Sequence, residues 1–136
     1  MGLQEKRAIK SFQEGSYAKL TEEINTLAGY PIEFDVQWDS LAVEEYTHMY
    51  EEGFTQVYFT PLIAAIKEIV VDDMGKEALK ETLKKISIKN EGGISSASYA
   101  YSFNNGVLTI DHQPFTNIGD INDRSKELAN LLMKQM

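Results

Sequence analysis

Residues 101–110 of the chain, YSFNNGVLTI, carry the strongest local structural signal in the sequence. The dipeptide Asn105-Gly106 is typical of a type I′ turn, because both central positions of that turn need a positive φ, which asparagine and glycine adopt most readily. A two-residue turn here predicts two cross-strand pairs of apolar side chains on one face: Phe103 with Leu108, and Tyr101 with Ile110. The polar residues between them then share the other face, so turn and hydrophobic pattern both predict a β-hairpin.

Two other segments alternate between apolar and polar residues, which is the pattern of a strand with one buried face. Residues 31–38 place Ile32, Phe34, Val36 and Trp38 on one face. Residues 86–88 read Ile-Ser-Ile. Together with the hairpin these segments predict about four strands, and we expect the last three to form a C-terminal β-meander.

Apolar residues at helical spacing predict helices for most of the remaining chain. The expected helices cover residues 3–28 (with a weak point at Gly15 and a stop at Gly29), 39–54 (capped by Asp39 or Ser40, with a possible end at Gly53), 61–74 (starting at Thr60-Pro61), 76–85 and 121–134. The order α-β-α-α-α-β-β-β-α lacks the strand–helix alternation of a parallel sheet, so we expect an α+β fold with a small antiparallel sheet. A chain of 136 residues is expected to form a single domain, residues 1–136.

The composition argues against several classes of function. The chain has 13 basic and 21 acidic residues, a net charge of −8, and no cysteine. This charge disfavours binding to nucleic acids and to anionic membranes, and the lack of cysteine excludes disulfides, thiolate nucleophiles and Cys-ligated zinc. No apolar run is long enough to span a membrane or to form a signal peptide, so we expect a cytoplasmic protein.

Charge is unevenly distributed along the chain. Between Leu20 and Ile66 there is no lysine or arginine, and the acidic residues there are Glu22, Glu23, Glu33, Asp35, Asp39, Glu44, Glu45, Glu51 and Glu52. Lysines gather later, at positions 76, 80 and 84. We therefore expect a protein-interaction module that docks a basic protein partner through Glu33, Asp35, Glu44, Glu45, Glu51 and Glu52. Small acidic partners of basic enzymes, such as toxin-neutralising immunity proteins, have this general character, and a regulatory domain would have it too.

A second hypothesis is a small enzyme or a metal-binding protein that uses one of the two histidines. Glu44, His48 and Glu52 have i, i+4, i+8 spacing, which would place them along one face of a helix as a possible metal-binding cluster. A second Glu-x-x-His motif is absent, so a solvated acidic face explains this cluster more simply, and no metal or other cofactor is expected. His112 follows Asp111, as in a catalytic dyad, but no serine lies in a Gly-x-Ser-x-Gly elbow.

A third hypothesis is a small-molecule carrier with an aromatic pocket. Trp38, Tyr99 and Tyr101 could line such a pocket between the sheet and the helices. The glycine-rich stretch 92–96 lacks the Gly-Lys-Ser/Thr ending of a phosphate-binding loop, so nucleotide binding is not indicated.

Overall fold

A four-stranded mixed sheet forms one layer of the molecule, and the computed structural model describes all 136 residues. The strands are β1 (Glu33–Val36), β2 (Lys85–Lys89), β3 (Tyr101–Asn104) and β4 (Val107–Asp111). The α-helices are α1 (Leu3–Phe12), α2 (Ala18–Ala28), α3 (Trp38–Leu41), α4 (Tyr50–Phe54), α5 (Thr60–Ile69), α6 (Asp73–Thr82), α7 (Ala97–Ala100) and α8 (Ile121–Lys134). Two π-helical turns, η1 (Gln13–Tyr17) and η3 (Thr55–Phe59), and one 3₁₀ turn, η2 (Thr47–Met49), complete the chain. The predicted α+β class is confirmed.

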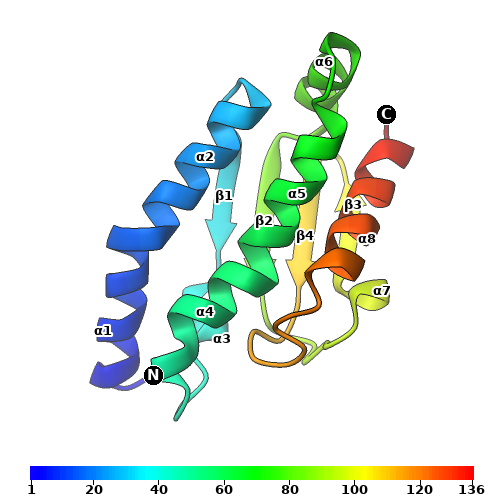
Figure 1. Ribbon diagram of the computed structural model, residues 1–136. Helices are drawn as coiled ribbons and strands as arrows, with labels where there is room; N and C mark the ends of the chain where they lie inside the picture. The colour runs from blue at the N-terminus through cyan, green and yellow to red at the C-terminus, as the bar shows by residue number, and fades with distance from the viewer.

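The main helices cover one face of the sheet (Figure 1), with α5 between α2 and α8. Side chains at alternate strand positions face these helices, and Ile86, Ile88, Leu108 and Ile110 are all fully buried. The opposite face of the sheet carries polar side chains that are exposed or half-buried. The hydrophobic core therefore lies between the two layers, as the alternating strand pattern requires.

The hairpin prediction is confirmed with its register. Phe103 pairs with Leu108 and Tyr101 pairs with Ile110 in an antiparallel ladder. Asn105 and Gly106 have φ values of 50° and 81°, the left-handed conformation that a type I′ turn needs. A local turn signal is sufficient here because the two partners are adjacent in the sequence.

The expectation of an antiparallel sheet with a β-meander is wrong. The strand order is β1-β2-β4-β3, and β2 is parallel to both β1 and β4. The residues between β2 and β3 carry the chain to the far edge, and the hairpin then returns β4 beside β2. The fully buried side chains of β4 explain its central position, while Tyr101 and Phe103 of the edge strand β3 are only half-buried.

The helix expected over residues 39–54 does not form as one element. Helix α3 ends at Leu41, and regular helix resumes only at Tyr50. From there the chain stays helical to Ile69, through α4, η3 and α5, so neither the expected end at Gly53 nor a new start at Thr60 occurs. Pro61 lacks the N–H that the carbonyl of Val57 would accept, and the backbone widens into the π turn just before it.

Acidic residues at the end of the buried helix have a structural role in the next one. Asp72 caps α6, and its carboxylate accepts a hydrogen bond of 2.8 Å from the N–H of Gly75. Asp73 lies in the first turn of α6, where the helix dipole favours negative charge. A Cβ at position 75 would lie 1.7 Å from the carbonyl oxygen of Ile69, so this tight turn requires glycine.

Gly53 allows the loop after β4 to approach α4 closely. A Cβ at this position would lie 2.7 Å from the ring of Phe115 and 2.8 Å from the carbonyl oxygen of Pro114. Gly15, by contrast, has no atom within 4 Å of its Cβ position. None of the helices is both long enough and apolar enough for a membrane span.

We predict that alanine substitutions at these two helical glycines have opposite effects on stability. Gly53→Ala should lower the free energy of unfolding by about 1–3 kcal/mol, because the new methyl group overlaps the Phe115 ring and a backbone oxygen. Gly15→Ala should raise it by up to about 1 kcal/mol, the usual difference in helix propensity. Urea denaturation measures both changes, and a stabilised Gly53→Ala protein would contradict the close packing.

Candidate functional site

The turn between α3 and α4 presents a concentration of acidic side chains. Glu44 and Glu45 lie in the turn, and Glu51 and Glu52 lie in the first turn of α4; all four are exposed. None of them belongs to an ion pair, although Glu51 accepts a hydrogen bond from the hydroxyl of Ser16. No lysine or arginine therefore lies within ion-pair distance of these four carboxylates.

The backbone of this turn is held in an uncommon conformation. Glu45 has a φ of 70°, a left-handed value that glycine and asparagine usually provide. The hydroxyl of Tyr50 donates a hydrogen bond of 2.9 Å to the carbonyl of Val43, and the amide of Gln4 donates one of 3.1 Å to the hydroxyl of Thr47. Contacts with two helices thus fix a turn that local preference alone would not select.

Tyr46, directly after Glu44 and Glu45 in the turn, presents an aromatic ring at the surface. Its ring is stacked on Phe115, with a centroid distance of 5.1 Å and an interplanar angle of 8°. Phe115 in turn stacks on Tyr50 at 5.7 Å, and it lies 6.0 Å from Phe54. Tyr46 is 43% exposed, while Tyr50 and Phe54 are buried. A column of rings therefore begins in the core and ends at the surface.

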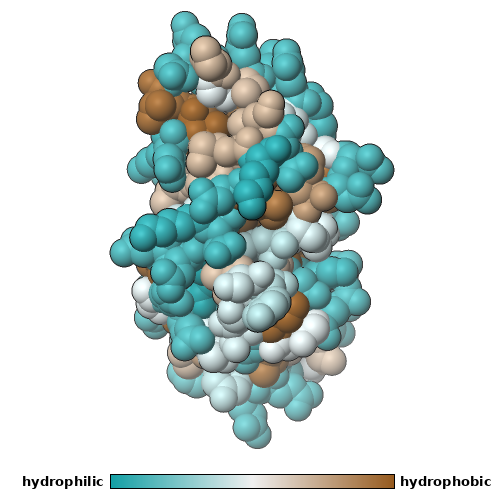
Figure 2. All heavy atoms as spheres, turned by 90° about the vertical axis from the view of Figure 1, so that its right-hand side faces the viewer, coloured by the Kyte–Doolittle hydropathy of each residue, from teal (hydrophilic) through white to brown (hydrophobic).

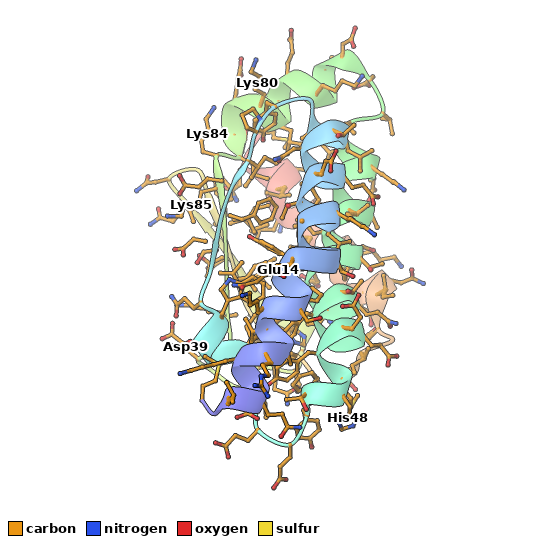
Figure 3. All side chains as sticks on the ribbon, turned by 90° about the vertical axis from the view of Figure 1, so that its left-hand side faces the viewer. Glu14, Asp39, His48, Lys80, Lys84 and Lys85 are labelled. Atoms are coloured by element: carbon orange, nitrogen blue, oxygen red, sulfur yellow. The ribbon has the colours of Figure 1, made fainter.

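We call Glu44, Glu45, Tyr46, Glu51 and Glu52 the acidic–aromatic surface. It lies at the end of the molecule where His48 is seen in Figure 3, whereas Lys80 and Lys84 lie at the other end, on and beside α6. Burial, with the charges of Glu5 and Glu44, raises the pKa of Tyr50 to about 12, so the phenol beneath this surface stays protonated. The turn and the first turn of α4 carry no lysine or arginine of their own, whereas α1, which packs against them, carries Lys6, Arg7 and Lys10.

Glu33 and Asp35 do not join this surface. Both lie on β1 and point to the open face of the sheet, where Lys85 lies 3.2 Å from Glu33 and 3.8 Å from Asp35. The six acids predicted to bind a partner are therefore divided between two faces, and a lysine from β2 offsets the charge of these two. Sequence spacing could not reveal this, because the ion pairs depend on the parallel pairing of β1 with β2.

The helical spacing expected for Glu44, His48 and Glu52 is absent, because residues 42–46 are not helical. His48 lies in the 3₁₀ turn and is exposed. No group of three or more histidine or acidic side chains is arranged to hold a metal ion.

His112 is fully buried and does not form a dyad with Asp111. The Asp111 carboxylate instead accepts hydrogen bonds from the backbone N–H groups of Glu91 and Gly92, at 2.9 and 3.2 Å. The Nε2 atom of His112 accepts a hydrogen bond of 3.2 Å from the Nε–H of Arg124, so the ring proton lies on Nδ1, which donates to the carbonyl of Gln113 at 2.7 Å. This histidine organises the interior of the protein.

Sequence reasoning missed Arg124, which is only 1% exposed. A signal was present, since Arg124 shares a helical face with Ile121 and Leu128, and a charged residue on a buried face is unusual. Burial lowers the pKa of His112 and the charge of Arg124 lowers it further, against the opposing effects of the Gln113 carbonyl and Asp111. His112 is therefore neutral at pH 7.

The three aromatic residues of the carrier hypothesis do not line one pocket. Trp38 packs edge-to-face on Phe12 and Tyr17 in the core, and Tyr99 is 78% exposed on α7. Tyr101 borders one of two polar hollows, of about 350 and 400 Å³, between α8 and the segment that contains α7. Figure 2 shows this side of the molecule, where strongly hydrophilic side chains adjoin an area of intermediate hydropathy.

No protein-family model matches this chain, and no curated protein or solved structure is significantly similar to it. Evidence for function therefore comes from the chain's own residues. Among the features described, only the acidic–aromatic surface combines exposure, unpaired charge and a fixed backbone.

We predict that the free energy of unfolding falls as the pH drops from 7 towards 5. The unfolded chain binds a proton at His112 near its ordinary pKa of about 6.5, whereas the folded protein keeps this ring neutral to a lower pH. Stability is thus fully present above about pH 6.5 and is lost as the pH falls towards the folded pKa. Urea denaturation at several pH values measures the slope.

The matched comparison uses the chain's two histidines. His112→Gln keeps an acceptor near the position of Nε2 but cannot titrate, so its stability should change less over this range. His48→Gln, at an exposed position, should retain most of the wild-type slope. If the pH dependence of the free energy of unfolding disappeared in His48→Gln and persisted in His112→Gln, its assignment to His112 would be wrong.

Proposed function

We propose that this protein is an interaction module that docks a basic protein partner through the acidic–aromatic surface. The observation that carries the proposal is the position of Tyr46, which is 43% exposed, lies flat on Phe115 and directly follows two exposed glutamates, Glu44 and Glu45, that form no ion pair. Folding alone does not require such an arrangement, because an exposed ring and repelling charges add little to stability.

The charges of this surface favour a cationic partner. Four carboxylates lie within the nine residues from Glu44 to Glu52, in a part of the chain without lysine or arginine. A field of this kind raises the association rate of an oppositely charged protein by 10- to 1,000-fold, on an order-of-magnitude scale. It also repels phosphate backbones, which agrees with the proposal that the partner is not a nucleic acid.

Tyr46 adds a specific contact to this general attraction. One face of its ring lies on Phe115, and the exposed part of the side chain offers a π-surface to a lysine or arginine of the partner. Arginine fits best, because its guanidinium stacks on aromatic rings and can also bond a carboxylate with two parallel hydrogen bonds. A neighbouring Glu44 or Glu45 supplies that carboxylate.

Lys80 and Lys84 project at the end of the molecule opposite His48 (Figure 3). Glu77 and Glu81 lie beside them, so these lysines do not form a separate positive surface. We propose a cytoplasmic setting, in keeping with a chain that has no cysteine and needs no oxidising compartment for its stability.

The first test reverses the charge of the surface. Glu44, Glu45, Glu51 and Glu52 are changed together to lysine, and binding to a hexa-arginine peptide is followed by stopped-flow fluorescence at low and high salt. We expect association at low salt to slow by at least about tenfold, since the attractive field is removed. Salt should slow the wild-type protein and leave the variant almost unaffected.

A matched control separates this surface from net charge. Glu22, Glu23, Glu68 and Glu77 are also exposed, and changing them to lysine gives the same change in net charge. This control should bind hexa-arginine nearly as well as the wild type. Equal losses in the two variants would mean that the peptide senses net charge alone, and the proposal would be wrong.

The second test removes the aromatic contact. Tyr46→Ala should weaken hexa-arginine binding by about fivefold, corresponding to about 1 kcal/mol for an exposed cation–π contact. It should weaken binding of a hexalysine peptide less, because the ammonium group stacks less well. Equilibrium titration measures both, and Tyr99→Ala, at another exposed tyrosine, provides the control.

A further inference from the structure

The loop between β4 and α8, residues 112–120, supplies the platform on which Tyr46 rests. It contributes Phe115, whose ring stacks on Tyr46 and meets the backbone of α4 at Gly53. The loop has no regular secondary structure. Its position therefore depends on the few hydrogen bonds that its backbone makes with the rest of the protein.

Several of these bonds join His112 and Gln113 to Lys89, Ile94 and Tyr58, and two come from Arg124 on α8. Its guanidinium donates to the carbonyl of Thr116 at 3.1 Å and to the carbonyl of Ile118 at 3.4 Å, and its Nε–H donates to His112 at 3.2 Å. These partners span the loop from its first residue almost to its end. One planar side chain thus ties both ends of the Phe115 segment to a buried helix face.

No carboxylate forms an ion pair with this buried guanidinium. Its three acceptors are two backbone carbonyls and one neutral imidazole nitrogen. The hydrogen bond from Arg124 to that nitrogen is lost when His112 is protonated, because an imidazolium ring carries a proton on both nitrogens and accepts no hydrogen bond. Protonation would therefore both remove an acceptor and place a second cation against the first.

The other groups that face His112 do not relieve this conflict. The Tyr58 hydroxyl, from η3, donates to the backbone carbonyl of His112 at 2.5 Å and does not reach its ring. Asp111, on β4, is held by the N–H groups of the loop before α7, and Tyr101, on β3, has a buried hydroxyl without a partner. Burial raises the pKa of both phenols, so neither supplies a negative charge.

We infer that Arg124 is the positioning residue of the acidic–aromatic surface, and that proton uptake by His112 releases the Arg124-bound loop and withdraws Phe115 from beneath Tyr46. Movement of the loop is the cheapest response, since β4 and α8 are anchored by the fully buried Ile110 and Leu128. The use of this device, acid-induced release of a partner, rests on the proposed function. The coupling between His112, Arg124 and the stacked rings of Phe115 and Tyr46 does not depend on the proposed function.

The experiment follows the rings by aromatic NMR during an acid titration. His48→Gln serves as the reference protein, because His48 is the only other histidine and lies beside Tyr46 in the sequence. We expect the His112 ring to titrate below its ordinary pKa of about 6.5, and the Tyr46 and Phe115 signals to shift along the same curve. The signals of Phe12, a ring in the core at the α1 side, should stay constant over that range.

Two variants identify the groups responsible. In the double variant His48→Gln, His112→Gln the Tyr46 and Phe115 signals should no longer shift with pH. In Arg124→Lys the positive charge remains, but an ammonium group cannot reach three acceptors in the geometry of a guanidinium. Its Tyr46 and Phe115 signals should already show loss of stacking at neutral pH, while the Phe12 signals remain native.

Several results would overturn the inference. These are protonation of His112 without a shift of the two rings, a ring shift that persists in the His112→Gln protein, and global unfolding in step with His112 protonation. The titration of the reference protein decides the matter even if Arg124→Lys fails to fold.

Binding of hexa-arginine supplies the functional arm. In the His48→Gln protein its affinity should fall about tenfold by the pH at which only about one molecule in ten keeps the loop in place. The double variant should keep its affinity over the same range, and an equal fall there would overturn the link between the loop and docking. If hexa-arginine fails to bind at neutral pH, the proposed function is wrong, while the ring titration still tests the roles of Arg124 and His112.

Discussion

Burying the guanidinium of Arg124 constrains a large part of this structure. A buried charge without an opposite charge is unfavourable unless hydrogen bonds satisfy its donors. Here the acceptors come from His112 and from the carbonyls of Thr116 and Ile118, so the loop after β4 must follow the shape of the guanidinium. That loop places Phe115 against Gly53, and Phe115 in turn supports Tyr46. A buried helix residue thereby holds the loop whose ring supports a distant surface side chain.

The parts of the fold that the sequence predicts are those settled by neighbouring residues. The type I′ turn at Asn105-Gly106 sets the register of the hairpin, because a two-residue turn leaves only one way for the strands to pair. The order and direction of the strands, by contrast, do not depend on neighbouring residues. The Ile-Ser-Ile pattern at 86–88 buries the same two side chains whether its neighbour is parallel or antiparallel, so periodicity carries no information on that choice. The connections before and after β2 are long enough to cross the sheet, and they allow β2 to run parallel to both of its neighbours.

In the candidate site, too, some features are visible in the sequence and others arise only from tertiary contacts. The clustering of acids between Leu20 and Ile66 is visible in the sequence, and it points correctly to exposed carboxylates at positions 44, 45, 51 and 52. The spacing of Tyr46 and Tyr50 suggests a helix, but both rings instead meet Phe115, which is more than sixty residues away in the chain. Pairing of Glu33 with Lys85 is equally non-local. Only contacts created by the tertiary fold separate the available acids from the neutralised ones.

Two unfavourable features of the structure lie on either side of the stacked rings of Tyr46 and Phe115. Glu45 adopts a left-handed backbone conformation that costs free energy, of order 1 kcal/mol or more for a residue of this kind. Arg124 is a desolvated cation without a counter-ion. A core selected for stability alone would replace both, with glycine or asparagine at the turn and an apolar side chain on α8. Both features instead converge on Tyr46, one by shaping the turn that carries it and the other by holding the ring beneath it. A turn held in this way would suit the proposed docking surface, because a turn fixed before the encounter loses less entropy when a partner binds.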